Sequence, residues 1–241
     1  KSPVEITKVG LSAPGLANED NSNIAHLPDR LPGLEGFIWA DYFKTPTLII
    51  NDAHSALMAE HQFGVLKTYQ NALLITLGTG VGGGVLIDGK LHQGLSQMAG
   101  HLGHMGINIH EDQASIFGMP GSLEYAMGNY SVPKRSHGKF KNTFDLVAAY
   151  ERGEPWATLV WLESVRKLSL GIVSLINILS PEAIAISGGI SMAGDSLMRP
   201  LKEYIDIFEF RPKNKTTQIC MARYGEMSGA IGAAAFAMKR L

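Results

Sequence analysis

The sequence predicts an α/β fold with two lobes, and three observations carry this prediction. Two apolar runs rich in β-branched residues flank a glycine-rich turn between residues 73 and 91. A short apolar run at Thr47–Ile50 ends in two polar residues and leads into a helical pattern. A long helix with an apolar stripe begins at Pro155 and is followed by the buried run Ala183–Ile186. Strands interleaved with helices are typical of α/β proteins, and a chain of 241 residues allows one large or two small domains.

The first quarter of the chain predicts a short strand, a long irregular loop, a helix, a strand and a second helix. The first strand is expected at Ile6–Leu11. The loop at 17–32 is rich in Asn, Asp, Pro and Gly, so we expect it at the surface or lining a cleft. The strand Thr47–Ile50 precedes a helix at 53–63. Its inward-facing residues are expected to be Ala53, Leu57 and Met58.

The glycine-rich turn is the most specific local signal. Five glycines lie between Gly78 and Gly84, Gly82 among them, whereas an ordinary two-residue hairpin needs one or two. Gly78, Gly80 and Gly83 formally satisfy G-x-G-x-x-G, but a dinucleotide site requires a helix directly after the loop, and here an Asp-Gly hairpin turn follows instead. We therefore expect the backbone N–H groups of the turn to converge on a phosphate, with the hydroxyl of Thr79 as a further donor. A tight turn without a ligand is the alternative.

The C-terminal part continues the α/β pattern. A helix from Pro155 to Leu179 is expected to end at the Ser-Pro pair that follows it. A buried strand at Ala183–Ile186, a turn at 187–189, a helix at 196–208 and a strand at 217–222 come next. The inward stripe of the long helix is expected to comprise Leu159, Leu162, Val165, Leu168, Ile172, Leu175 and Ile176. The last helix, 226–241, carries Gly229, Ala230, Gly232 and Ala233, which permit a close approach to a neighbouring element.

Composition excludes several classes of protein. Lys and Arg (21) nearly balance Asp and Glu (22), and no basic run is longer than 133–135 or 211–215, so the sequence has no nucleic-acid footprint. The single Cys220 excludes an internal disulfide and a cysteine-based zinc site, and we expect it to be a buried hydrophobic residue. No apolar run is long enough to span a bilayer, and a reducing cytoplasm is the expected compartment.

Two polar clusters are candidates for chemistry. Asp52, next to Asn51 at the end of a buried strand, is a candidate general base for a hydroxyl group, with an N-cap of the following helix as the alternative. His101 and His104 are three residues apart and share a face if their segment is helical. They could be a metal pair, contacts to a sugar, or incidental polar residues. Further metal ligands could come from 110–112, His-Glu-Asp, although the spacing matches no strong zinc pattern.

Six motifs, taken in order, resemble those of the ROK family of repressors and sugar kinases. They are Gly10-Leu-Ser-Ala-Pro-Gly15, Ile50-Asn-Asp-Ala53, Leu77-Gly-Thr-Gly-Val-Gly-Gly-Gly84, Ala99-Gly-His-Leu-Gly-His104, Ser122-Leu-Glu124 and Ile186-Ser-Gly-Gly-Ile190. The resemblance implies the two-lobed actin-like, hexokinase-like ATPase fold, which is related to ribonuclease H. It also implies that Asp52 is the catalytic base and that Gly188 and Gly189 let an adenine ring approach the backbone. The sugar-binding residues that it implies are Gly15, Asn51, His101, His104 and Glu124.

The chain departs from the family pattern in two places. His101 stands where the family has Glu, and Ser115, Phe117 and Ser122 stand where it has zinc-binding cysteines, so we expect no zinc and expect Phe117 to fill the vacated space. The family's D-x-G-G-T hairpin, whose Asp positions Mg²⁺, has no counterpart in residues 1–10. The N-terminal part of the first lobe is therefore expected to be absent from these residues, which would make them a fragment of a kinase or a degenerate sugar binder. On that expectation the 241 residues alone could be inactive.

Together these observations predict an ATP-dependent kinase for a hexose or hexose derivative. Mg²⁺ is expected to accompany ATP, and the resemblance implies a homodimer. The predicted N-terminal lobe comprises residues 1–70, with the helix at 226–241 packed near it, and the predicted C-terminal lobe comprises residues 71–225. A sugar-sensing regulator or non-catalytic sugar-binding protein is the alternative from another class. An NAD-dependent enzyme is a third interpretation, which a helix directly after Gly84 would favour.

Overall fold

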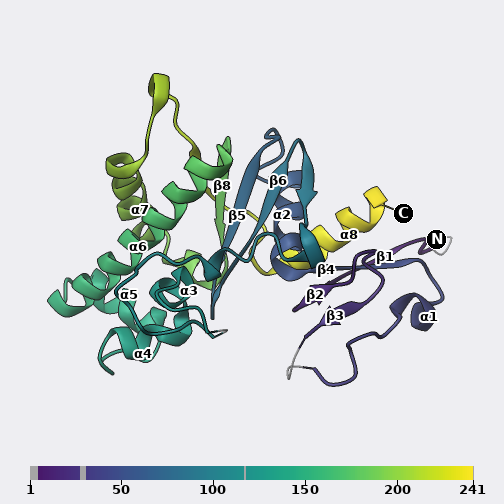
Figure 1. Cartoon of the computed structure of the whole chain (residues 1–241), viewed down its shortest axis with the longest axis horizontal. Helices are drawn as coiled ribbons and strands as arrows, with labels where there is room; N and C mark the ends of the chain where they lie inside the picture. Colours follow the sequence, from purple (N-terminus) through teal and green to yellow (C-terminus); the bar gives the residue numbers. More distant parts are fainter. Residues whose placement is uncertain (1–4, 28–30, 117, 241) are drawn as a thin grey trace. The chain divides into compact units, whose positions relative to one another are not determined.

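A computed structural model describes residues 5–27, 31–116 and 118–240 of the chain (Figure 1). The chain forms two units. Unit 1 consists of Lys1–Leu74, Gly84–Gly100 and Ala222–Leu241, and unit 2 consists of Ile75–Gly83 and His101–Met221. The glycine-rich run thus continues from unit 2 into unit 1 after Gly83.

The described strands form three sheets. In the first, β1 (Val9–Ala13) runs parallel to β4 (Thr47–Asn51), and Ala13 lies opposite Asn51. In the second, β2 (Leu16–Ala17) and β3 (Ile24–His26) pair antiparallel, within the segment for which the sequence predicts an irregular loop. The third has the order β7-β6-β5-β8-β9, with β6 and β7 antiparallel and β8 and β9 parallel. Its strands are β5 (Ala72–Leu77), β6 (Val81–Ile87), β7 (Lys90–His92), β8 (Ala183–Ser187) and β9 (Gln218–Met221).

Four of the helices match those expected at 53–63, 155–179, 196–208 and 226–241, within two residues at each end. The α-helices are α1 (Trp39–Phe43), α2 (Asp52–Phe63), α3 (Leu123–Met127), α4 (Val132–Arg135), α5 (Thr143–Glu151), α6 (Pro155–Leu179), α7 (Asp195–Phe208) and α8 (Ser228–Arg240). Six short 3-10 helices are η1 (Leu95–Gln97), η2 (Leu102–His104), η3 (Asn129–Ser131), η4 (Gly189–Ala193), η5 (Pro212–Asn214) and η6 (Gly225–Met227). A strand and not a helix follows the glycine turn, which removes the support that the dinucleotide-binding interpretation required.

Small residues let α8 pack closely on its neighbours in unit 1 (Figure 1). A Cβ atom on Gly232 would lie 1.7 Å from the carbonyl oxygen of Ser55 in α2. A Cβ atom on Gly10 in β1 would lie 2.1 Å from the carbonyl oxygen of Ala233. The core between these elements consists of Leu48, Ile50, Met58, Ala233, Phe236 and Ala237. This packing fixes β4, whose last residue is the N-cap of α2.

In unit 2, α6 is the central helix, and α3, α5 and α7 pack against it. Its boundaries match the prediction, because Pro155 opens it and Ser180 ends it in a left-handed conformation. Five of the seven residues of the predicted inward stripe are buried, namely Val165, Leu168, Ile172, Leu175 and Ile176. The prediction is wrong only in the first turns, where Leu159 is 59% exposed while Val160 and Trp161 are buried. The helix carries apolar residues on more than one side there, so spacing alone does not decide which of them packs.

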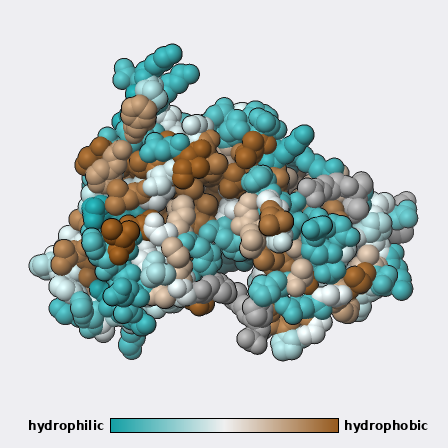
Figure 2. All heavy atoms as spheres, in the orientation of Figure 1, coloured by the Kyte–Doolittle hydropathy of each residue, from teal (hydrophilic) through white to brown (hydrophobic). Residues whose placement is uncertain are grey.

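Three smaller expectations can be compared with the structure. The first strand begins at Val9 and not at Ile6. Cys220 is half-buried, not fully buried, and its thiol lies 3.7 Å from the carbonyl oxygen of Ile184. The basic cluster at 211–215 lies in the segment around η5, which projects at the upper edge of Figure 1, and the same projection has a hydrophilic tip in Figure 2. Lys213 and Lys215 are exposed there, as expected for solvated loop charges.

None of the helices in the described part of the chain combines the length and apolar character needed to cross a membrane.

Candidate functional site

The glycine turn between β5 and β6 is held by its own backbone and by the segment that follows α3. The N–H of Gly78 donates to the carbonyl oxygen of Gly80 at 2.9 Å. The carbonyl oxygens of Gly78 and Thr79 accept from the N–H groups of Asn129 (2.9 Å) and Tyr130 (3.2 Å). Since the turn's carbonyl groups are engaged in this way, its other face is available for a ligand.

A pocket of about 430 Å³ and a larger one of about 730 Å³ lie in unit 2, and the larger pocket opens at the glycine turn. It brings together three of the predicted phosphate- and nucleotide-binding residues, Gly78, Thr79 and Gly189. Its other walls are Asn129, Asn142, Thr143, Phe144, Val147, Ala148, Glu151, Ile190, Met192 and Ala193. The remaining predicted glycines, Gly80, Gly82, Gly83 and Gly188, are not among the lining residues.

Thr143 is the polar residue of the larger pocket that most clearly lacks a partner. Its side chain is 6% exposed, and its Oγ1 atom has no hydrogen-bond partner among the described residues. Its backbone N–H donates to Oδ1 of Asn129 at 2.7 Å, which connects the start of α5 to the residue that anchors the glycine turn. A buried hydroxyl without a partner costs free energy.

Gly188 supports the pocket without lining it. Its φ is +89°, and a Cβ atom there would lie 2.4 Å from the carbonyl oxygen of Leu77, the last residue of β5. Only glycine therefore fits between the end of β5 and the turn after β8. The neighbouring Gly189 begins η4, which carries one wall of the pocket.

Glu124 is buried beside the glycine turn. Its Oε2 accepts from the N–H of Val81 at 3.2 Å, and its Oε1 accepts from the N–H of Ile116 at 3.3 Å. It lies in the first turn of α3, which Ser122 caps by accepting from the N–H of Tyr125. A carboxylate held by backbone donors is fixed in direction, so this group can only accept hydrogen bonds from a ligand that reaches it.

His101 and His104 lie together at η2. His101 is the N-cap residue of this short helix, and the two ring centroids are 6.0 Å apart. Residues three apart eclipse one another in a 3-10 helix, which explains why the rings are neighbours. Nowhere in the described residues do three or more His, Cys, Asp or Glu side chains form a group that could hold a metal ion. Phe117 lies outside the described residues.

In unit 1 the structure brings together Gly15, Asn51 and Asp52. The side-chain amide of Asn51 donates to the carbonyl oxygen of Gly15 at 2.9 Å, and its Oδ1 accepts from the N–H of Ala53 at 2.9 Å. Asn51 is therefore the N-cap of α2. Asp52 is the first residue of α2, is exposed, and accepts from the N–H of Ala53 at 2.8 Å. The start of a helix accommodates a negative charge, which suits a carboxylate there.

Sequence reasoning missed most walls of the larger pocket. Asn142 carries a recognisable signal, since Asn before a helical run is a preferred N-cap and its Oδ1 accepts from the N–H of Asp145. Asn129 and Thr143 carry no such signal, because their roles depend on hydrogen bonds to residues distant in sequence.

Comparisons with known proteins agree on one family. The model of the ROK family matches residues 1–240. The glucokinase of Halalkalibacterium halodurans is 30% identical over an alignment of 254 positions, which covers 96% of this chain and 76% of that protein. The N-acetylmannosamine kinase of Vibrio cholerae is 36% identical over 157 residues, 64% of this chain and 54% of that protein. The crystal structure of a ROK hexokinase from Thermus thermophilus superposes with a TM-score of 0.81 at 25% identity, covering 95% of this chain and 78% of that one.

Proposed function

Because the chain belongs to the ROK family, we propose that it is a sugar kinase that transfers a phosphoryl group from ATP to a hydroxyl group of a hexose or a hexose derivative. The similarity to a glucokinase and to an N-acetylmannosamine kinase supports this substrate class. The single observation that carries the proposal is the larger pocket of unit 2, which ends at the glycine turn.

The larger pocket fits ATP in size and chemistry. About 730 Å³ is enough for a ligand of this size, and the walls combine apolar side chains with a few polar groups. The glycine turn would hold the phosphates, and the apolar side chains of the pocket would contact the base. ATP would bring Mg²⁺ with it, bound by the phosphate oxygens, and the cation would neutralise charge as the phosphoryl group is transferred.

Asp52 is the proposed general base. Phosphoryl transfer requires an oriented hydroxyl and a group that accepts its proton, and the carboxylate of Asp52 is exposed at the end of β4. Asn51 fixes this segment by its bonds to Gly15 and to the start of α2. We propose that Asn51 and the backbone at Gly15 contribute sugar contacts from unit 1, and that His101, His104 and Glu124 contribute sugar contacts from unit 2. The imidazole of His101, in place of the family's Glu, changes the balance of donors and acceptors at one hydroxyl.

The substitution Asp52→Asn tests the assignment. We expect turnover to fall by at least about a thousandfold, because an amide keeps the shape and cannot accept the proton, while sugar affinity stays within about tenfold. A coupled assay of ADP release, run on a panel of hexoses and N-acetylhexosamines, measures turnover, and calorimetry measures binding. Asp41→Asn, an exposed Asp in the first turn of α1, is the matched control and should retain full activity. An Asp52→Asn variant that keeps most of the turnover would refute the role.

The alternative is a sugar-sensing regulator that binds a hexose without phosphorylating it. Sugar binding without ADP release on any hexose or N-acetylhexosamine would favour it. We also propose a homodimer and a cytoplasmic location; the latter is consistent with a single cysteine.

A further inference from the structure

The smaller pocket of unit 2, of about 430 Å³, shares no lining residue with the larger one. It lies between the segment around α3 and α4 and the first half of α6. Its walls are Glu111, Tyr125, Ala126, Lys134, Arg135, His137, Trp156, Leu159, Val160, Glu163, Ser164 and Lys167. Nothing in the proposed sugar kinase reaction uses these side chains.

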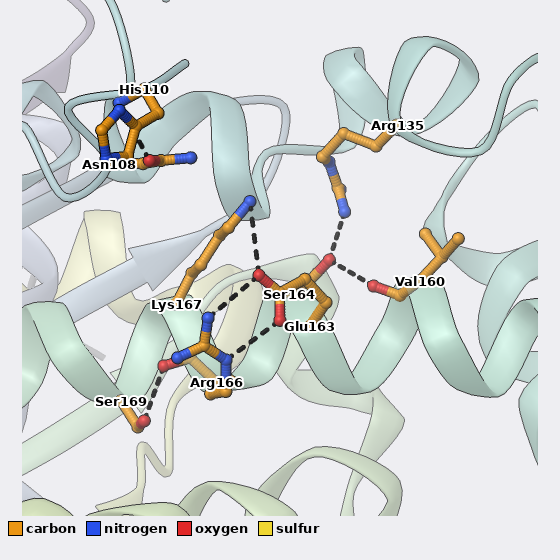
Figure 3. A network of polar contacts seen from close by, with 9 residues as sticks. All are labelled: Asn108, His110, Arg135, Val160, Glu163, Ser164, Arg166, Lys167 and Ser169. Carbon is orange, nitrogen blue, oxygen red and sulfur yellow. Dashed lines mark hydrogen bonds and ion pairs between the residues drawn. The ribbon is translucent and has the colours of Figure 1, made fainter.

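Arg135 is the key side chain of this pocket, because it is a partly buried cation without a carboxylate partner in the described residues. Its Nε donates to Oγ of Ser131 at 2.9 Å, its Nη1 to Oγ of Ser164, and its Nη2 to the carbonyl oxygen of Gly128 at 3.3 Å. Figure 3 shows the guanidinium directed at Ser164, whose hydroxyl in turn donates to the carbonyl oxygen of Val160. A guanidinium has five N–H groups, so two remain, one each on Nη1 and Nη2.

The surroundings of Arg135 do not neutralise its charge. Burial lowers the pKa of Arg135 to about 10, and the nearby phenols of Tyr125 and Tyr130 oppose that shift. Both phenols are neutral near pH 7, since burial raises the pKa of Tyr125 and raises that of Tyr130 to about 12. A partly buried cation without a counter-charge is costly, and a bound anion would lower that cost.

The other charges of the pocket leave an excess of positive charge. Glu163 is engaged by Arg166 at 2.9 and 3.2 Å and lies 3.6 Å from Lys167, as Figure 3 shows. Arg166 itself does not line the pocket. Among the lining residues, the positive charges of Lys134, Arg135 and Lys167 exceed the negative charges of Glu111 and Glu163 by one, so the pocket favours an anion.

One wall of the pocket is apolar. Leu159 is 59% exposed at the position where helical spacing predicts a core residue, and Val160 and Trp156 stand beside it. The indole N–H of Trp156 donates to the carbonyl oxygen of Ser136 at 3.2 Å, which fixes the ring. An exposed apolar wall next to a cationic one suits a ligand with a phosphate at one end and a carbon skeleton at the other.

We propose that this pocket is a second ligand site that binds a small organic phosphate monoester. The phosphate binds Arg135 and Lys134, and the carbon skeleton lies against Trp156 and Leu159. The site is separate from the proposed catalytic residues, so a ligand here acts on the enzyme as an effector and not as a substrate.

The test follows the Nε–Hε resonance of Arg135 by NMR in the full chain, because this signal reports on the smaller pocket even if the probe also binds elsewhere. The probes are glucose 6-phosphate, inorganic phosphate, and glucose with chloride at equal ionic strength. We expect a saturable shift with glucose 6-phosphate, a weaker one with inorganic phosphate and none with glucose and chloride. Arg135→Lys identifies the resonance by its loss. Its Kd, followed by the indole N–H resonance of Trp156 in the same pocket, should rise at least about tenfold, since lysine lacks the planar fork.

A second variant keeps the test valid if Arg135→Lys does not fold. Lys134→Gln changes an exposed side chain and should raise the Kd about threefold or more. Lys202→Gln, an exposed lysine of α7 outside the pocket, is the matched control and should leave the Kd unchanged. No saturable shift up to about 10 mM, or the same shift with chloride, would overturn the site. Equal affinities for inorganic phosphate and glucose 6-phosphate would overturn the role of the apolar wall.

Discussion

At the scale of single residues, Gly80 and Glu124 compete for one small volume in unit 2. A Cβ atom added at Gly80 would lie 2.2 Å from Oε2 of Glu124, the oxygen that accepts from the N–H of Val81. A Cβ atom added at Gly78 would meet no atom within 4 Å. Two glycines of the same turn therefore differ in what they tolerate.

We expect Gly80→Ala to lower the free energy of unfolding by about 1–3 kcal/mol, because either the carboxylate leaves its backbone donor or the turn shifts. Gly78→Ala is the matched control and should cost less than about 1 kcal/mol. Urea unfolding followed by circular dichroism measures both. If both variants lost the same free energy of unfolding, the contact with Glu124 would not be the cause of the loss.

Two serines at the family's cysteine positions accept hydrogen bonds from nearby backbone N–H groups. The hydroxyl of Ser115 accepts from the N–H of Met119 at 3.1 Å, and that of Ser122 accepts from the N–H of Tyr125 at 3.1 Å. We predict no zinc in the protein, because a neutral hydroxyl is a poor ligand and these two stabilise the local backbone. Elemental analysis after purification without chelators checks this. Near-stoichiometric zinc would instead point to His101, His104 and His110.

At the scale of elements, α8 contains two glycines in different surroundings. A Cβ atom on Gly232 would lie 1.7 Å from a backbone oxygen of α2, whereas one on Gly229 would lie 3.1 Å from the movable hydroxyl of Ser12. Alanine favours a helix by up to about 1 kcal/mol over glycine, so only a clash can make either substitution costly.

We expect Gly232→Ala to lower the free energy of unfolding by at least about 2 kcal/mol, because α8 must move away from α2. Gly229→Ala should be neutral or slightly stabilising, since the serine side chain can rotate. Thermal and urea unfolding of both variants test this. If Gly232→Ala were neutral, α8 could not be packed against α2 as closely as described.

The same scale shows what sequence patterns can predict. The bounds of α6 follow from Pro155 and Ser180, and the strand before Asn51 follows from its apolar run, because these signals are local. Most of the buried face of α6 follows from its apolar spacing as well. The first turns do not follow, since Leu159 and Trp161 are both apolar and only the neighbouring helices decide which is buried. The pair β2 and β3 is too short to leave a pattern.

At the scale of the whole molecule, stability should depend on pH through His61, which is 9% exposed on α2. Burial lowers the pKa of His61, against the opposing hydrogen bond to the carbonyl of Leu66. Below about pH 6.5 the unfolded state therefore binds the proton more readily than the folded state, and the free energy of unfolding decreases as the pH is lowered.

We expect the melting temperature to decline between about pH 7 and pH 5, and His61→Gln to make this decline shallower. His92→Gln, on the exposed β7, is the matched control and should leave the slope unchanged. Calorimetric scans across this range measure the effect. A slope that is the same in wild type and His61→Gln would assign the pH dependence to other groups.

The candidate site was only partly predictable, because only some of its residues lie in local sequence motifs. Asn51, Asp52 and the glycine turn lie in continuous motifs, so a resemblance over a few residues identifies them. Asn129, Thr143 and Arg135 acquire their roles from hydrogen bonds and burial that the fold creates. No spacing within the sequence marks a buried hydroxyl or a guanidinium that lacks a counter-charge.

The position of Glu124 couples the two proposed substrates thermodynamically. Its Oε2 accepts from the N–H of Val81, directly after the turn whose carbonyl groups hold the segment at Asn129. In the proposed function a hexose hydroxyl donates to this carboxylate and the turn holds the phosphates, so occupancy by the sugar would change the turn. Linkage is reciprocal, and ATP would then alter hexose affinity by the same factor as hexose alters ATP affinity. Titrations with a non-hydrolysable ATP analogue should return a coupling factor different from one, and a factor of one would contradict the coupling.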